Sequence, residues 1–323
     1  VFQRTPSSID LRGNSPTDSD WYATLKTGWQ TERNDNFTRL LMGLDVEEDL
    51  VNDGWTDIFK SLGDLMNDTD NSELTDEELN QLGEIIDFQR DNRIRDRVAN
   101  IVKDKKTAEG LKHWYRPWCK RPTFNDEYLP TFNRPNVTLV DTAPMGVAEI
   151  NERGVVHDGK AYPLDVLIYA TGFKWMEAAT FNMVEGRGGQ TLQEKWKEKG
   201  TQTFLGIHSN GFPNLFIVAG PQGGGGSFNF TDALEVHGDY LIWMLETMRE
   251  KGAGTVDVDK AQEDAYVEHC KQVDIQTSAF RDCYSYYNGE GKAEPGSLSY
   301  YGGGRWHKYR VHAQETLEPY IFD

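Results

Sequence analysis

Residues 118–141 read WCKRPTFNDEYLPTFNRPNVTLVD. Two adjacent cations, Lys120 and Arg121, stand directly before a proline and among aromatic side chains. Pro122 disfavours helix for the residue before it, so Arg121 is predicted to lie extended in a connection. A planar, permanently charged guanidinium there suits an oxyanion, and the lysine suits a phosphate as a point charge. A surface ion pair with Asp126 or Glu127 is the alternative.

The chain as a whole is acidic. It has 323 residues, 34 Lys+Arg against 52 Asp+Glu, and a formal net charge of -18. The length and the 37% hydrophobic content suit one large or two ordinary domains with a real core. So acidic a chain repels nucleic acid and anionic lipid, and no apolar run is long enough to span a membrane.

The cysteines, the absence of metal-binding spacings and the first residue each narrow the kind of protein expected. The three cysteines, Cys119, Cys270 and Cys283, lack close pairing, which favours a reducing compartment and predicts a cytoplasmic location. No CxxC or HExxH spacing occurs, so no metal site is predicted. The chain opens with Val1 and has no initiator Met, and we expect it to be a piece of something longer.

Helical signals dominate the first third of the sequence. Thr75 and Glu78 have capping-box spacing, and Leu79, Leu82, Ile85 and Ile86 recur on one helical face.

After Pro135 the pattern changes to strands: NVTLVD is predicted to be a short strand, and GVAEINERGVVHDGKAYPLDVLIYATGF a hairpin followed by an apolar strand. NLFIVAGPQ repeats the apolar strand with a turn, and FTDALEVHGDYLIWMLETMREKG is predicted to be a helix capped by Thr231 or Asp232 and ended by Gly252. Strands that end in glycine and lead into helices indicate an α/β fold with a helical insertion.

Two apolar strands end in glycine turns, VLIYATGF and FIVAGPQGGGG. In open α/β sheets ligands bind at such carboxyl ends, although glycines also simply close turns. No GxGxxG dinucleotide fingerprint is present, no nucleophile elbow is present, and the histidines are scattered.

Four segments, in this order, resemble the class B flavoprotein monooxygenases, and among them the Baeyer–Villiger type. They are VFQRTPSSIDLRGN, KRPTFNDEYLPTFNRPNVTLVD, DVLIYATGF, and GPQ before a helix. The resemblance runs from Val1 to about Arg305, and the KRP run is its most specific part. It implies the fold of flavoproteins with two dinucleotide-binding domains, here a partial NADPH domain with a helical insertion plus the carboxyl-terminal half of the FAD domain.

The resemblance also implies an activity. In that family NADPH reduces FAD, O2 adds to give a peroxyflavin, and one oxygen is inserted next to a ketone carbonyl to form an ester or lactone. Arg121 would be the catalytic arginine that stabilises the peroxide. The cofactor-binding residues implied are Lys120, Arg4 and Thr5 for the 2′-phosphate, Ala170, Thr171 and Gly172 through their backbone, Gly220, Pro221 and Gln222 at the flavin ring, and Tyr286 in the mobile loop. Tyr286 stands where commoner members have tryptophan, and packing is the other interpretation of its role.

The implied domain organisation is incomplete. Residues 1–12 would be the tail of the NADPH domain, 13–118 its helical insertion, and 119–145 the return segment carrying KRP. Residues 146–323 would be the carboxyl-terminal part of the FAD domain, with a mobile loop at 281–298. Both GxGxxG loops would lie upstream, so the chain by itself is expected to be inactive.

Two alternatives stay open at this stage. One is an N- or S-oxygenating flavin monooxygenase, which would not need an arginine for a peroxide anion. The other is a non-catalytic interaction fragment, with the acidic helices from Asp45 to Asp87 as its partner surface. The ketone and the oligomeric state are not fixed by the sequence.

Overall fold

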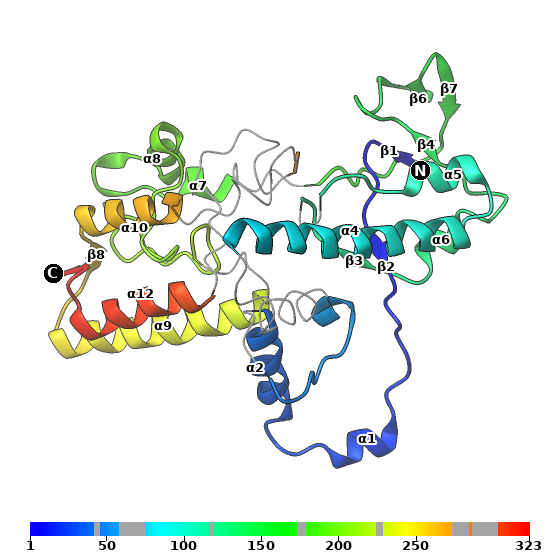
Figure 1. Ribbon diagram of the computed structural model, residues 1–323. Coiled ribbons are helices and arrows are strands. Elements are labelled where there is room, and N and C mark those ends of the chain that lie inside the picture. Colours follow the sequence, from blue (N-terminus) through cyan, green and yellow to red (C-terminus); the bar gives the residue numbers. More distant parts are fainter. Residues whose placement is uncertain are drawn as a thin grey trace. The chain divides into compact units, whose positions relative to one another are not determined.

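The computed structural model describes residues 1–41, 46–57, 75–116, 119–172, 179–223, 229–272, 284–285 and 303–323. The chain divides into two compact units, one of residues 1–33 and 45–172, the other of residues 34–44 and 173–323. Figure 1 shows their elements. Among the described residues no helix has the length and apolar character needed to cross a bilayer.

The first unit is organised by two parallel strand pairs that join distant parts of the chain. β1 (Phe2–Gln3) pairs with β4 (Val140–Asp141), and β2 (Ile9–Asp10) pairs with β3 (Thr123–Phe124). Parts of the segments 1–12 and 119–145 therefore lie side by side. The predicted NVTLVD strand is present only as the two residues of β4. The other elements of this unit are α1 (Ser19–Thr24), the start of α2 (Trp29–Leu41), α4 (Asp76–Ile101), α5 (Lys105–Leu111), α6 (Tyr128–Thr131), β5 (Glu149–Asn151), β6 (Gly154–His157) and β7 (Lys160–Pro163).

The predicted capping box and hairpin are both confirmed. The Thr75 hydroxyl accepts a hydrogen bond from the Glu78 N–H, and the Glu78 carboxylate accepts one from the Thr75 N–H. The helix continues to Ile101, and its buried stripe begins later than predicted, with Ile94 and Val98, whereas Ile85 is 51% exposed. β5, β6 and β7 form the antiparallel hairpin predicted from GVAEINERGVVHDGKAYP.

Two predicted apolar strands do not form. Residues 164–172 and 214–222 contain no strand, and Val166 and Ile168 are 74% and 84% exposed. A strand forms only where a neighbouring strand satisfies its N–H and C=O groups. Within the described part of the chain no strand pairs with either segment.

The second unit packs three helices around an aromatic core. α9 (Phe230–Lys251), α10 (Lys260–Gln272) and α12 (Gly303–Thr316) enclose a core that also includes the antiparallel pair β8 (Val256–Val258) and β9 (Tyr320–Phe322). Figure 1 shows α12 running beside α9, and Tyr240, Met244 and Trp306 are among the buried side chains between them. The remaining elements are α7 (Ala179–Met183), a 3₁₀ turn (Arg187–Gly189) and α8 (Leu192–Lys199).

The ends of α9 differ in how well they were predicted. Gly252 ends the helix in the left-handed conformation, as expected. The N-cap is Asn229, not Thr231 or Asp232, because Asn229 has the extended backbone and its side-chain oxygen accepts from the Asp232 N–H.

The spacing of the cysteines favours a reducing compartment over a disulfide-bonded chain. Cys270 is free and buried, as that prediction requires, but Cys119 is disulfide-bonded, which is contrary to it. Cys283 lies outside the described residues.

Candidate functional site

The pairing of β3 with β2 fixes the position of the Lys120–Arg121 dipeptide, which precedes β3. Arg121 stands two residues before β3, and the Thr123 N–H and hydroxyl both donate to the Ser8 carbonyl. Pro122 is buried and Arg121 is exposed, so the backbone is anchored while the guanidinium reaches outward. The prediction that Arg121 lies in a connection and not in a helix is confirmed.

Arg121 lies over an aromatic ring. Its guanidinium carbon is 5.7 Å from the centroid of the Trp55 ring, a cation–π arrangement. Trp55 in turn packs on Phe124, the fifth residue of KRPTF, at a centroid distance of 5.3 Å. The cation, the tryptophan and the strand residue that follows the motif therefore form one contiguous group.

Lys120 has a similar arrangement with a second ring. Its Nζ lies 5.7 Å from the centroid of the Tyr115 ring. The Tyr115 hydroxyl accepts a hydrogen bond of 2.9 Å from the Ser8 N–H, and burial raises the pKa of this phenol to about 12. Tyr115 thus stays neutral near physiological pH and offers Lys120 a fixed ring face.

Asp126, considered above as an ion-pair partner of Arg121, has other partners. Its carboxylate accepts hydrogen bonds from the Arg12 and Gly13 N–H groups at 2.9 and 3.0 Å. It also lies 3.6 Å from the guanidinium of Arg97 on α4. The acid of the motif therefore holds the chain that follows β2.

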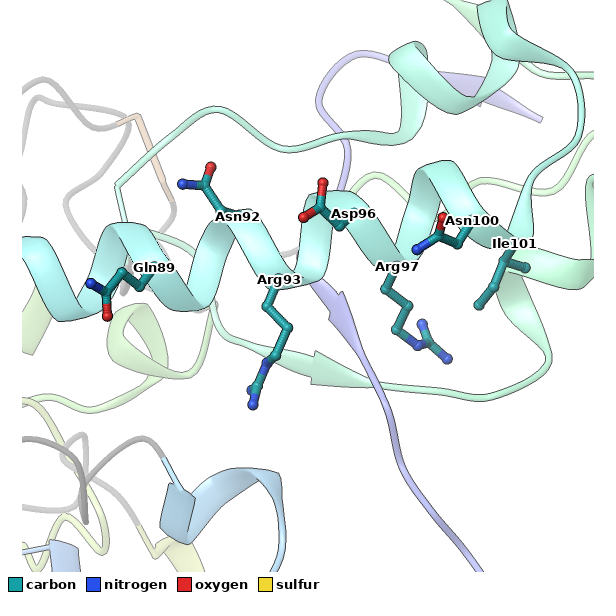
Figure 2. A pocket seen from close by; sticks show the side chains of 7 residues that line it. All are labelled: Gln89, Asn92, Arg93, Asp96, Arg97, Asn100 and Ile101. Carbon is teal, nitrogen blue, oxygen red and sulfur yellow. The ribbon is translucent and has the colours of Figure 1, made fainter.

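Two cavities adjoin α4. Figure 2 shows the smaller, about 650 Å³, where Arg93 and Arg97 extend from the helix beside Asn100 and Ile101. The larger, about 1000 Å³, is lined by residues 10–18 and 50–54 and again by Arg93 and Arg97. Both arginines already have partners: Arg93 bridges Asp10 and Asp57, and Arg97 donates to the Ile9 and Asn125 carbonyls. No predicted site residue lines either cavity.

Arg4 and Thr5, predicted to bind phosphate with Lys120, directly follow β1 and are exposed. Ala170, Thr171 and Gly172 are also exposed. Gly172 has φ of 89°, and an added Cβ would meet no atom within 4 Å. The requirement for glycine there is conformational.

The turn of Gly220, Pro221 and Gln222 is tightly built. Ala219 and Gln222 both have positive φ, and a Cβ on Gly220 would lie 2.4 Å from the Ile217 side chain. The Gln222 side chain points inward: its oxygen accepts from the Thr203 hydroxyl at 2.6 Å and its nitrogen donates to the Thr201 carbonyl. The Gln222 backbone carbonyl also accepts from the Tyr266 hydroxyl, so this residue is held from both its side chain and its backbone.

His237 was not predicted to belong to the site, because the histidines are scattered along the sequence. Its Nδ1 accepts from the Ala219 N–H at 3.0 Å and its Nε2 donates to the Gly223 carbonyl at 2.9 Å, so one ring fastens both ends of the turn. Burial lowers the pKa of His237 and keeps the imidazole neutral, as these two bonds require. The ring stacks on Trp306 at 5.1 Å. No sequence pattern links residues 237 and 219.

The available groups fit part of a nucleotide cofactor site. Two cations on aromatic faces suit phosphate or a developing oxyanion, and two glycine turns present backbone groups. A pyrophosphate-binding loop is not encoded in the sequence. In the part of the chain that the structure describes, no cluster of His, Cys, Asp or Glu could hold a metal ion. Tyr286 lies outside the described residues, as does most of the predicted mobile loop.

Comparisons with known proteins agree with the resemblance in the sequence. The chain is 41% identical over 285 residues to a Baeyer–Villiger monooxygenase of Stachybotrys chlorohalonatus, covering 87% of this chain and 45% of that protein. A polycyclic ketone monooxygenase from Thermothelomyces thermophila superposes with a TM-score of 0.81 at 32% identity, over 100% of this chain and 55% of that one. A structure of OTEMO in complex with FAD and NADP has a TM-score of 0.73 at 21% identity, over 100% of this chain and 62% of that one, and shows the fold alone.

No family model matches the chain. The chain spans about half the length of the curated relatives that it matches. The predicted fold class, that of flavoproteins with two dinucleotide-binding domains, is confirmed for the portion present.

Proposed function

Since this chain is a relative of the Baeyer–Villiger monooxygenases along most of its length, we propose that it is the carboxyl-terminal portion of such an enzyme. The complete protein would use NADPH, FAD and O2 to convert a ketone to an ester or lactone. The observation that carries the proposal is the Lys120–Arg121 pair, anchored by β3 with each cation over an aromatic ring.

Each residue has a distinct part in this proposal. FAD, when bound, carries electrons from NADPH to O2. Arg121 stabilises the negative charge that develops on the reacting oxygen, and Lys120, with Arg4 and Thr5, binds the phosphate of the nicotinamide cofactor. The turns at 170–172 and 220–222 present backbone groups to the cofactors, and the N-terminus of α9 adds the positive end of its dipole.

The decisive experiment uses the full-length protein with FAD bound. We expect Arg121→Ala to oxidise NADPH at a normal rate but to form ester roughly 10²–10³-fold more slowly, releasing hydrogen peroxide instead. Arg134→Ala, an exposed arginine of the same sequence run, is the matched control and should keep ester formation. Ester formation that survives Arg121→Ala, or a wild-type protein that oxidises only sulfides or amines, contradicts the ketone proposal.

A second candidate, a non-catalytic fragment, is favoured for these 323 residues alone by the missing GxGxxG loops. Its test is the visible spectrum of the purified chain after FAD in excess is added and then removed. A colourless protein assigns catalysis to a longer chain. A yellow protein that NADPH bleaches and air restores contradicts the fragment interpretation. The cytoplasmic location and the four-part domain division stay predictions.

A further inference from the structure

We propose that Trp55 is a positioning residue for Arg121, holding the guanidinium in place through the face of its indole ring. The functional meaning of this contact rests on the proposed function. Trp55 lies in the segment 13–118 predicted to be a helical insertion, so the insertion would contribute directly to the site. No feature of the sequence around Trp55 indicated such a role.

The geometry connects three residues. The guanidinium carbon of Arg121 is 5.7 Å from the Trp55 centroid, within the range in which the negative face of an aromatic ring attracts a cation. Trp55 is tilted by 53° against Phe124, with 5.3 Å between centroids. Phe124 belongs to β3, the strand that anchors the Arg121 backbone. The Trp55 ring therefore packs on the same strand that holds Arg121.

Trp55 is itself held by the turn around it. A Cβ on Gly54 would lie 2.3 Å from the Phe124 ring, so only glycine allows this close approach. The Thr56 side chain is fully buried, donates to the Asp53 carbonyl and accepts from the Asp53 N–H. Asp53 also accepts from the Trp55 N–H and lies 3.3 Å from the Arg12 guanidinium. This hydrogen-bonded turn fixes the backbone that carries the ring.

The physical reason for such a support is the freedom of an exposed arginine. Arg121 is anchored at its backbone, but its long side chain has many rotamers, and an oxyanion is stabilised only when the donors already point at it. A planar guanidinium over a ring loses little further freedom when its N–H groups bind, since its edge stays available while its face is covered. The indole therefore favours one position of the guanidinium and does not accept hydrogen bonds from its N–H groups.

The first test uses the 323-residue chain and needs no cofactor. In NMR spectra the Arg121 side-chain Nε–H, identified by its loss in Arg121→Lys, is expected at an upfield, ring-current-shifted position. Trp55→Met, which keeps apolar bulk but has no ring, should remove the shift, and Trp55→Phe should retain part of it. Trp114→Leu, which removes the ring under Arg95 instead, is the matched control and should leave the Arg121 signal in place. An Arg121 signal that does not move in Trp55→Met overturns the proposal.

The second test uses the full-length protein with FAD bound. We expect Trp55→Met to lower the ester formed per NADPH oxidised by about two- to fivefold, with the KM for NADPH unchanged, and Trp55→Phe to restore most of it. If Arg121→Ala leaves ester formation intact, the proposed function fails while the NMR result on Trp55 still stands. If Arg121→Ala abolishes ester formation but Trp55→Met preserves it, only the positioning role of Trp55 is overturned.

Discussion

His208 illustrates how a single buried residue sets a pH dependence. Its Nε2 lies 2.8 Å from the Tyr240 hydroxyl, which donates on to the Tyr320 hydroxyl at 2.7 Å. Complete burial lowers the pKa of His208 from 6.5 to about 3. The native imidazole is therefore neutral over a range in which the unfolded one binds a proton, so its contribution to stability is complete above pH 6.5 and decreases as the pH falls towards 3.

We expect the free energy of unfolding to decrease by about 1.4 kcal/mol per pH unit through this histidine between pH 6 and 4. His208→Gln, which does not titrate, should flatten the slope measured by urea unfolding at several pH values. His312→Gln, at an exposed position of α12, is the matched control. A slope that is the same in wild type and His208→Gln contradicts this prediction.

Single residues also show which contacts the sequence can predict and which it cannot. The placement of Arg121 in a connection follows from Pro122, its neighbour in the chain. Trp55 beneath Arg121, and His237 across the 219–223 turn, depend on pairings between residues far apart in sequence. Local chemistry therefore singled out the charged groups of the candidate site, and only the three-dimensional structure identified Trp55 and His237 as contacts of Arg121 and of the 219–223 turn.

At the scale of the element, one glycine inside α9 and one directly after it have opposite requirements. Gly252, at the end of the helix, has φ of 67°, where a side chain is strained. Gly238 lies inside the helix, and a Cβ there would meet no atom within 4 Å. We expect Gly252→Ala to destabilise the chain by about 1 kcal/mol and Gly238→Ala to stabilise it by about 0.8 kcal/mol. Thermal unfolding should show shifts of opposite sign, and shifts of the same sign would contradict the assignment of the helix end.

Elements with local signals were predicted well, and those that depend on pairing were not. The Thr75 capping box, the β5–β7 hairpin and the Gly252 stop each follow from residues within a few positions of one another. The apolar stretches 164–169 and 214–219 have strand composition, but their hydrogen-bonding partners are not among the described strands. Strand-like composition therefore does not predict a strand unless a second strand is available to pair with it.

At the scale of the whole molecule, the exposed apolar stretch has a testable meaning. Ile168 is 84% and Tyr169 is 66% exposed, unusual for a run of such side chains. We infer, on the basis of the proposed function, that the part of the longer enzyme outside these 323 residues covers this stretch. Ile168→Asp should then leave the unfolding midpoint of the 323-residue chain unchanged but sharply reduce FAD retention by the full-length protein, as measured by flavin absorbance after gel filtration. Lys160→Asp, on the exposed hairpin nearby in sequence, should change neither, and full FAD retention by Ile168→Asp would contradict the inference.

The long-range strand pairs have a consequence for the length of the chain between them. The Thr123 hydroxyl bonds the carbonyl of a residue 115 positions earlier, so the intervening segment leaves and re-enters the unit at neighbouring points. The entropy of closing such a loop grows only logarithmically, and doubling its length costs about 0.6 kcal/mol. Additions to or deletions from the segment are therefore thermodynamically cheap, provided that the turn carrying Trp55 still reaches Arg121. The stability of the unit therefore sets only a weak limit on how long the segment between β2 and β3 can be.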